Sequence, residues 1–198
     1  MFFDTEINLW NCKLVLECDM WRTLKTETLI NDYHVTLKKN KVELPGGAVI
    51  DDFYTVTIPD AAMIAALTTD NKIILKTEYR YACQSDIIEC PAGMLNPDES
   101  EPIVAAKREL LEETGYSSGD WTYLGYTWES TSKLTNKMYL FLAKDCQKVA
   151  SQQLDENEHL DVVEVPLSEA MDMVMKGEIC ANSSAHLILK TEKILNSF

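Results

Sequence analysis

The sequence predicts an α+β protein in which a mixed β-sheet is sandwiched between helices. Short β-rich runs recur along the 198 residues, and helical stretches follow strands. Three stretches have helical periodicity: Ile103–Glu113, Ser168–Lys176 and Ser183–Asn196. The first of them has two apolar stripes, one through Ile103 and Leu110 and the other through Val104. Because both stripes can be buried, we expect this helix to lie between two layers.

Residues 1–60 are predicted to form a small antiparallel sheet, separate from a domain of residues 61–198. Turn-forming residues at 39–41 and 45–47 separate three short β-rich runs. The runs are Tyr33–Lys38, Val42–Leu44 and Phe53–Ile58. Leu14 and Leu16 alternate with polar residues and indicate a further strand. So small a sheet has little to bury by itself, and we expect it to pack on the rest of the chain or on a second copy of the protein.

The domain of residues 61–198 begins with a predicted hairpin, Ala61–Thr68 and Lys72–Glu78, closed by a turn at 69–71. Arg80 follows at the end of the second strand, and two interpretations of it carry equal weight. It is either a contact for a phosphate or an aromatic ring, or a surface cation paired with Glu78 or Asp86. Four further strands are predicted: Ile87–Pro91, Trp121–Tyr126, Lys137–Ala143 and Asp161–Pro166.

Three carboxylates share one face of the first predicted helix. Glu109, Glu112 and Glu113 are spaced i, i+3 and i+4. Like charges at this spacing repel by roughly 0.2–0.5 kcal/mol per pair, so a cluster of three indicates a bound cation. Pro102 at the start and Gly115 just past the end are the residues expected at helix termini. We interpret this stretch as a metal site for phosphate chemistry.

The bulk composition restricts the partners. The net charge of −14 argues against a nucleic-acid backbone or an anionic membrane surface, and an anionic small substrate would need a divalent cation to bridge it. Six cysteines without CxxC spacing argue against a zinc site and indicate free thiols. Asp4 and Glu6 stand where a signal peptide would be basic, and no apolar run is as long as a membrane span. A cytoplasmic location is therefore expected.

The stretch Gly93–Tyr116 resembles the Nudix box: Gly, five residues, Glu, seven residues, then Arg-Glu-apolar-x-Glu-Glu-x-Gly-apolar. The matching residues are Gly93, Glu99, Arg108, Glu109, Leu110, Glu112, Glu113, Gly115 and Tyr116. One spacing departs from the pattern, because eight residues separate Glu99 from Arg108, and strict register puts Ser100 in the Glu position. Over Trp21–Leu195 the flanking stretches resemble the ADP-ribose pyrophosphatase branch of this family.

The resemblance implies an α/β/α sandwich and a homodimer whose subunits exchange their N-terminal sheets. It also implies a divalent cofactor, Mg²⁺ or alternatively Mn²⁺. The implied direct ligands of the ion are Glu109, Glu113 and the backbone carbonyl of Ala92, and Glu112 either shares an ion or supports its ligands. Arg108 is expected to orient a carboxylate, and Gly93 to permit a sharp turn. The longer loop leaves the role of Glu99 open.

The reaction implied is hydrolysis of the pyrophosphate of a nucleoside diphosphate sugar, with ADP-ribose giving AMP and ribose 5-phosphate as the leading case. The resemblance places the base that activates water in the loop Leu154–Leu160. We favour Glu156 as the base and Glu158 as an ion or water ligand, and leave the reverse open. GDP-mannose and UDP-sugars remain alternative substrates, because ADP-ribose enzymes commonly carry a Pro in the loop that here contains Thr131. A non-catalytic nucleotide-binding module is a further alternative, against which the retained carboxylates argue.

Overall fold

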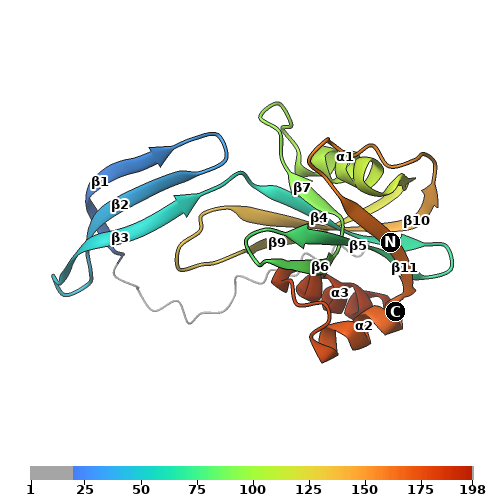
Figure 1. Ribbon diagram of the computed structural model, residues 1–198. Coiled ribbons are helices and arrows are strands. Elements are labelled where there is room, and N and C mark those ends of the chain that lie inside the picture. Colours follow the sequence, from blue (N-terminus) through green and yellow to red (C-terminus); the bar gives the residue numbers. More distant parts are fainter. Residues whose placement is uncertain (1–19, 198) are drawn as a thin grey trace, which may run out of the picture.

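The computed structural model describes residues 20–197, which form a three-stranded sheet, an eight-stranded sheet and three helices (Figure 1). The smaller sheet contains β1 (Arg22–Asn31), β2 (Thr36–Glu43) and β3 (Val49–Thr57). The larger sheet contains β4 (Ala61–Thr68), β5 (Lys72–Arg80), β6 (Ser85–Glu89), β7 (Ala92–Met94), β8 (Tyr116–Ser117), β9 (Asp120–Trp128), β10 (Lys137–Lys148) and β11 (Leu160–Pro166). The helices are α1 (Pro102–Thr114), α2 (Leu167–Lys176) and α3 (Asn182–Leu195). None of these helices is long and apolar enough to cross a bilayer.

The larger sheet is mixed, as the sequence predicts. Its strand order is β11-β5-β4-β10-β8, with β6 on β5, β7 on β4 and β9 on β10. β4 and β10 run parallel, whereas the other pairs are antiparallel. Every residue of β4 is buried, which is typical of a strand covered on both faces.

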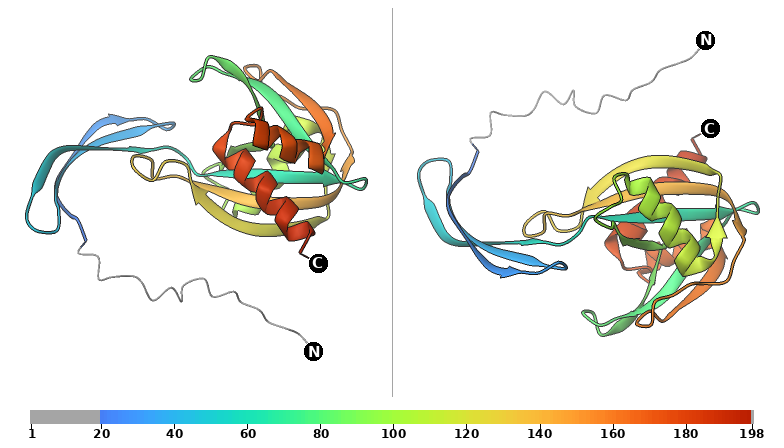
Figure 2. Two further views of the ribbon diagram at one scale, coloured as in Figure 1. Left: turned by 90° about the horizontal axis from the view of Figure 1, so that it is seen from below. Right: turned by 90° about the horizontal axis from the view of Figure 1, so that it is seen from above.

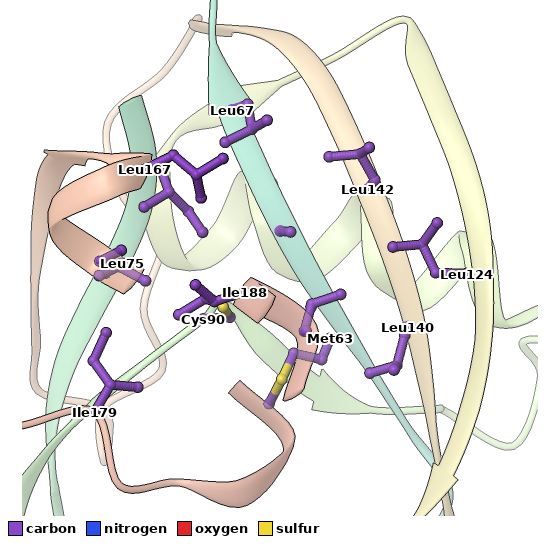
Figure 3. Packing of buried hydrophobic residues seen from close by; sticks show 14 residues of the cluster. Met63, Leu67, Leu75, Cys90, Leu124, Leu140, Leu142, Leu167, Ile179 and Ile188 are labelled. Atoms are coloured by element: carbon purple, nitrogen blue, oxygen red, sulfur yellow. The ribbon is translucent and has the colours of Figure 1, made fainter. Parts of the chain in front are cut away.

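The two faces of β4 bury different layers of helix, because successive side chains of a strand point to opposite sides. Met63 and Leu67 pack in a cluster with residues of α2 and α3, whereas Ala62 and Ile64 pack in a second cluster with residues of α1. Figure 3 shows the first cluster, in which Ile188 lies close to the β4 side chains. The predicted sandwich of a mixed sheet between helices is confirmed.

The expected burial of both stripes of α1 is wrong. Ala106 and Leu110 are fully buried against the sheet, but Val104 is 48% exposed. The helix covers one face of the sheet from outside, and within residues 20–197 no second layer lies over it (Figure 2). One apolar stripe is therefore sufficient to hold α1 in place.

The N-terminal sheet differs from its predicted form in two respects. β1 was not predicted, and residues 39–41 belong to the continuous strand β2 and do not form a turn. Inside β2 the Asn40 amide donates to the Phe53 carbonyl oxygen at 3.2 Å and to Thr55 Oγ1 at 3.1 Å, so it pairs with β3. The predicted strand around Leu14 and Leu16 lies outside the described residues. Figure 2 shows this sheet projecting away from the larger one.

Candidate active site

One cavity of about 890 Å³ opens beside α1, between that helix, the β5–β6 hairpin and the start of α3. Its charged lining is strongly unbalanced, with eight carboxylates and three cations. The acidic residues are Glu78, Glu89, Glu109, Glu112, Glu113, Glu129, Asp155 and Glu158. The basic residues are Lys76, Arg80 and Arg108. Such a cavity attracts cations, and it accepts an anionic ligand only when additional positive charge accompanies it.

The carboxylate-bearing face of α1 lines this cavity because both helix ends are fixed. Pro102 occupies the first turn, and Gly115 adopts a left-handed φ of 76° at the C-cap, where its N–H bonds to the Leu111 carbonyl oxygen. Glu109 and Glu113 are brought against β7. A Cβ on Gly93 would overlap the carboxylate of Glu109, so the present position of that carboxylate depends on glycine there.

Arg108 joins four acceptors around the helix. Its Nε and Nη2 bond to Glu99 at 2.8 and 3.1 Å, and Nη1 bonds to Glu109 at 2.6 Å and to Glu112 at 3.1 Å. Nη2 also donates to the Met94 carbonyl oxygen at 3.0 Å. The Arg108 guanidinium lowers the pKa of Glu99, and the same pairing raises the pKa of Arg108. Despite the longer loop, Glu99 thus reaches Arg108.

The third carboxylate, Glu113, has different partners. Its side chain is buried, Oε1 pairs with the Lys76 ammonium, and Oε2 accepts the Ala92 N–H at 3.0 Å. Burial raises the pKa of Glu113 to about 7, although Lys76 opposes the shift. Burial also raises the pKa of Glu109. The sequence did not single out Lys76, although its position two residues after buried Ile74 puts it on the α1 face of β5.

The carboxylates of Glu109 and Glu112 pair with Arg108, and that of Glu113 pairs with Lys76. In residues 20–197 no three His, Cys, Asp or Glu side chains are grouped so as to hold a metal ion. The donors nevertheless fit a hard divalent cation, which binds carboxylate and carbonyl oxygens. The excess of negative charge on the cavity lining also favours the binding of a divalent cation.

Arg80 combines features of both interpretations of the sequence. Arg80 lines the cavity, and its guanidinium pairs with Glu78 at 3.0 Å. Glu78 is one of the two partners that the surface-cation interpretation named. The second partner in the structure is Glu89, whose carboxylate accepts the Arg80 Nε–H at 3.0 Å, and no bond to Asp86 is formed. Arg80 therefore stands at the cavity wall between two carboxylates.

The acidic loop after β10 reaches the cavity with two of its carboxylates. Asp155 and Glu158 line the cavity, and Glu158 accepts the Asp155 N–H at 3.2 Å. Glu156 is exposed and lies outside the lining. The loop is held at the C-terminal end of α1, where Gln152 Nε2 donates to the Glu113 carbonyl oxygen and the Gln153 N–H to that of Glu112, both at 2.8 Å.

Comparison with known proteins identifies the family of this α/β/α sandwich and indicates a pyrophosphatase hydrolase. The family model described as NUDIX domain matches residues 57–182, and the chain belongs to the Nudix family, in its ADP-ribose pyrophosphatase-like branch.

Two relatives and one solved structure illustrate the likeness. The chain is 35% identical to the methanol dehydrogenase activator of Bacillus methanolicus, over 80% of this chain and 85% of that protein. It is 32% identical to the ADP-ribose pyrophosphatase of Bacillus subtilis (strain 168), over 84% of this chain and 90% of that protein. A crystal structure of an ADP compounds hydrolase superposes with a TM-score of 0.77 at 25% identity, over 89% of this chain and 95% of that one.

Proposed function

We propose that this protein hydrolyses the pyrophosphate bond of a nucleoside diphosphate sugar in a reaction that depends on Mg²⁺, and that ADP-ribose, cleaved to AMP and ribose 5-phosphate, is its main substrate. The observation that carries the proposal is the set of three carboxylates on α1, gathered at the wall of a cavity with a large excess of negative charge. The similarity to an ADP-ribose pyrophosphatase supports the choice of nucleotide.

The divalent ion would be held by Glu109, Glu112, Glu113 and the backbone carbonyl of Ala92, with Mn²⁺ as the alternative to Mg²⁺. When bound, such an ion neutralises the charge on phosphate oxygens and favours ionisation of bound water. Arg108 keeps the carboxylates of Glu109 and Glu112 in place through charge-assisted hydrogen bonds.

The remaining steps fall to side chains of the acidic loop and the β5 strand. A water molecule attacks one phosphorus, the bridging P–O bond breaks, and a carboxylate takes the proton of the water. The sequence favoured Glu156 as this base, but Glu158 lines the cavity and Glu156 does not, so we propose Glu158. Arg80 lies on the same cavity wall, and we propose that it binds a phosphate oxygen of the substrate.

The second candidate function is a regulatory, nucleotide-binding module without turnover. One observation favours it, since one relative is named an activator of another enzyme. The test is incubation with ADP-ribose, GDP-mannose, UDP-glucose and dinucleoside polyphosphates, each with Mg²⁺ and with a chelator, followed by chromatography of the products. AMP released from ADP-ribose with Mg²⁺ supports the main proposal. Faster cleavage of GDP-mannose or a UDP-sugar would make that nucleotide sugar the main substrate. Tight binding without products supports the regulatory module.

We also propose that residues 1–60 are a dimerisation region and residues 61–198 the Nudix hydrolase domain, in a cytoplasmic homodimer. β1 is exposed along its whole length and carries the exposed apolar side chains of Leu29 and Ile30, and exposed Trp21 directly precedes it. A homodimer that covers this sheet accounts for the exposure. Light scattering coupled to size exclusion tests it: a mass of twice 22.5 kDa supports the proposal, and a monomer at micromolar concentration contradicts it.

A further inference from the structure

Lys76 is a buried lysine in the floor of the active-site cavity. Its side chain is only 2% exposed, and its ammonium contacts Glu113 and lies 3.1 Å from Glu78 Oε2. These two ion pairs place the positive charge of the lysine inside the cluster of carboxylates.

A charged residue is unusual at this position of β5, because the residues before it are apolar and fully buried. Ile73, Ile74 and Leu75 of β5 are fully buried, and Lys76 continues the α1-facing side of the strand after Ile74. A buried ammonium is costly unless carboxylates compensate it, and an apolar residue at this point would extend the core without that cost. The lysine at this position therefore indicates an electrostatic role toward Glu113.

We propose that Lys76 is a built-in cation of the carboxylate cluster, which holds Glu113 when no divalent ion is bound and lowers the affinity of the cluster for that ion. The inference rests on the proposed function in taking Glu113 as a ligand of the ion. It follows from where the charges lie, because the ammonium occupies one oxygen of the Glu113 carboxylate and repels any second cation brought to the same group. Lys76 is thus a positioning residue, which acts through Glu113.

The experiment measures the binding of Mn²⁺ to the full-length protein in the absence of any nucleotide, by loss of the electron paramagnetic resonance signal of the free ion. Lys76→Met is compared with wild type and with Lys72→Met. Lys72 lies on the same strand, but its side chain is 41% exposed, pairs with Asp70 and Glu164, and lies outside the cavity lining. The proposal predicts Mn²⁺ binding roughly tenfold tighter in Lys76→Met, and unchanged binding in Lys72→Met.

Thermal unfolding with chelator and with Mn²⁺ gives a second measurement. Without the lysine, Glu113 and Glu78 lose their shared counter-ion, so Lys76→Met is predicted to have a lower Tm in chelator and a larger rise of Tm on addition of Mn²⁺ than wild type. If Lys76→Met cannot be purified folded, it is refolded from denaturant in both buffers. Recovery with Mn²⁺ and not with chelator supports the proposal, whereas failure in both overturns it.

Equal Mn²⁺ affinity in Lys76→Met and wild type also overturns the proposal, as does weaker binding in the variant. Neither result depends on turnover, so the hydrolysis assay tests the proposed function separately. If the protein hydrolyses ADP-ribose and Mn²⁺ affinity is unchanged in Lys76→Met, the proposed function stands and this role of Lys76 is wrong. If the protein hydrolyses none of the nucleotides and the variant binds Mn²⁺ more tightly, the role of Lys76 stands and the proposed function is wrong.

Discussion

Glu99 bonds to Arg108 at two points, with Oε1 2.8 Å from Nε and Oε2 3.1 Å from Nη2. Glu99 Oε2 also accepts the Asn96 N–H at 2.7 Å, so the same carboxylate closes the loop that precedes α1. The extra residue between Glu99 and Arg108 is accommodated within this loop, and the two side chains bond to each other despite it. Glu99 therefore fixes the guanidinium that in turn holds Glu109 and Glu112.

Glu99→Ala should loosen Arg108 and lower both stability and turnover, because the guanidinium loses its two-point partner. The sign of the pH dependence follows from the lowered pKa of Glu99. Its contribution to stability is present above the ordinary carboxyl pKa and is lost as the pH falls through the lowered folded-state value. The difference in Tm between wild type and Glu99→Ala should therefore shrink as the solution is acidified, and a constant difference would contradict the role.

Gly93→Ala should cost about 1–3 kcal/mol of stability and most of the activity, because the added methyl group overlaps the Glu109 carboxylate. Gly119→Ala is the matched control, since a Cβ at Gly119 meets no atom within 4 Å. Urea denaturation of both variants gives the comparison. Equal stability and equal activity of the two variants would show that the Glu109 carboxylate can move aside without loss.

Glu113→Gln should lower the free energy of unfolding by about 3 kcal/mol, because it leaves the buried Lys76 ammonium without its strongest partner. The double variant Glu113→Gln, Lys76→Met should regain most of that loss, because no buried charge is then unpaired. It should remain inactive, because a proposed ligand of the ion is still missing. Denaturation in chelator and the hydrolysis assay separate the two effects. A double variant as unstable as Glu113→Gln would refute the pairing.

The affinity for Mn²⁺ should rise as the pH increases through about 7. Glu113 has a pKa of about 7 because of burial, and an ion that binds its carboxylate must displace the proton that the group carries at lower pH. Titrations between pH 5.5 and 8 check this, at buffer concentrations that do not chelate the ion. An affinity independent of pH over this range would contradict competition between the ion and a proton on Glu113.

Glu158→Gln should reduce kcat by roughly 10²–10⁴-fold with little change in Tm, because Glu158 is the proposed base. Glu156→Gln is the matched control in the same loop and should stay within about twofold of wild type, since Glu156 is exposed and does not line the cavity. Steady-state kinetics of the two variants decide between the two assignments. The reverse pattern would restore Glu156 as the base.

The sequence predicted those parts of the structure that depend on local pattern. The ends of α1 follow from Pro102 and Gly115, and the shared face of Glu109, Glu112 and Glu113 follows from helical spacing alone. β1 was missed because its Thr, Lys, Glu and Leu residues give no apolar alternation, and the strand is exposed along its whole length.

Features that depend on tertiary placement were not accessible from the sequence. The role of Lys76 needs the register of β5 against α1, which sets the buried ammonium beside Glu113. The choice between Glu156 and Glu158 needs the path of the loop, which Gln152 and Gln153 fix at the end of α1. The opposed pKa shifts of Glu99 and Glu113 likewise come from burial and partners brought together by folding.

If the carboxylate face of α1 serves Mg²⁺-dependent hydrolysis, Glu112→Gln should abolish most of the activity without unfolding the protein. The side chain of Glu112 is 41% exposed and pairs with Arg108 and not with the buried Lys76, so its replacement by Gln should change Tm little. The measurement is the rate of AMP release from ADP-ribose by wild type and Glu112→Gln, with Mg²⁺ and with chelator. Wild type should release AMP only with Mg²⁺, and Glu112→Gln should release it at least a hundredfold more slowly. Turnover that persists in chelator, or a Glu112→Gln variant as fast as wild type, would contradict this role of the carboxylate face.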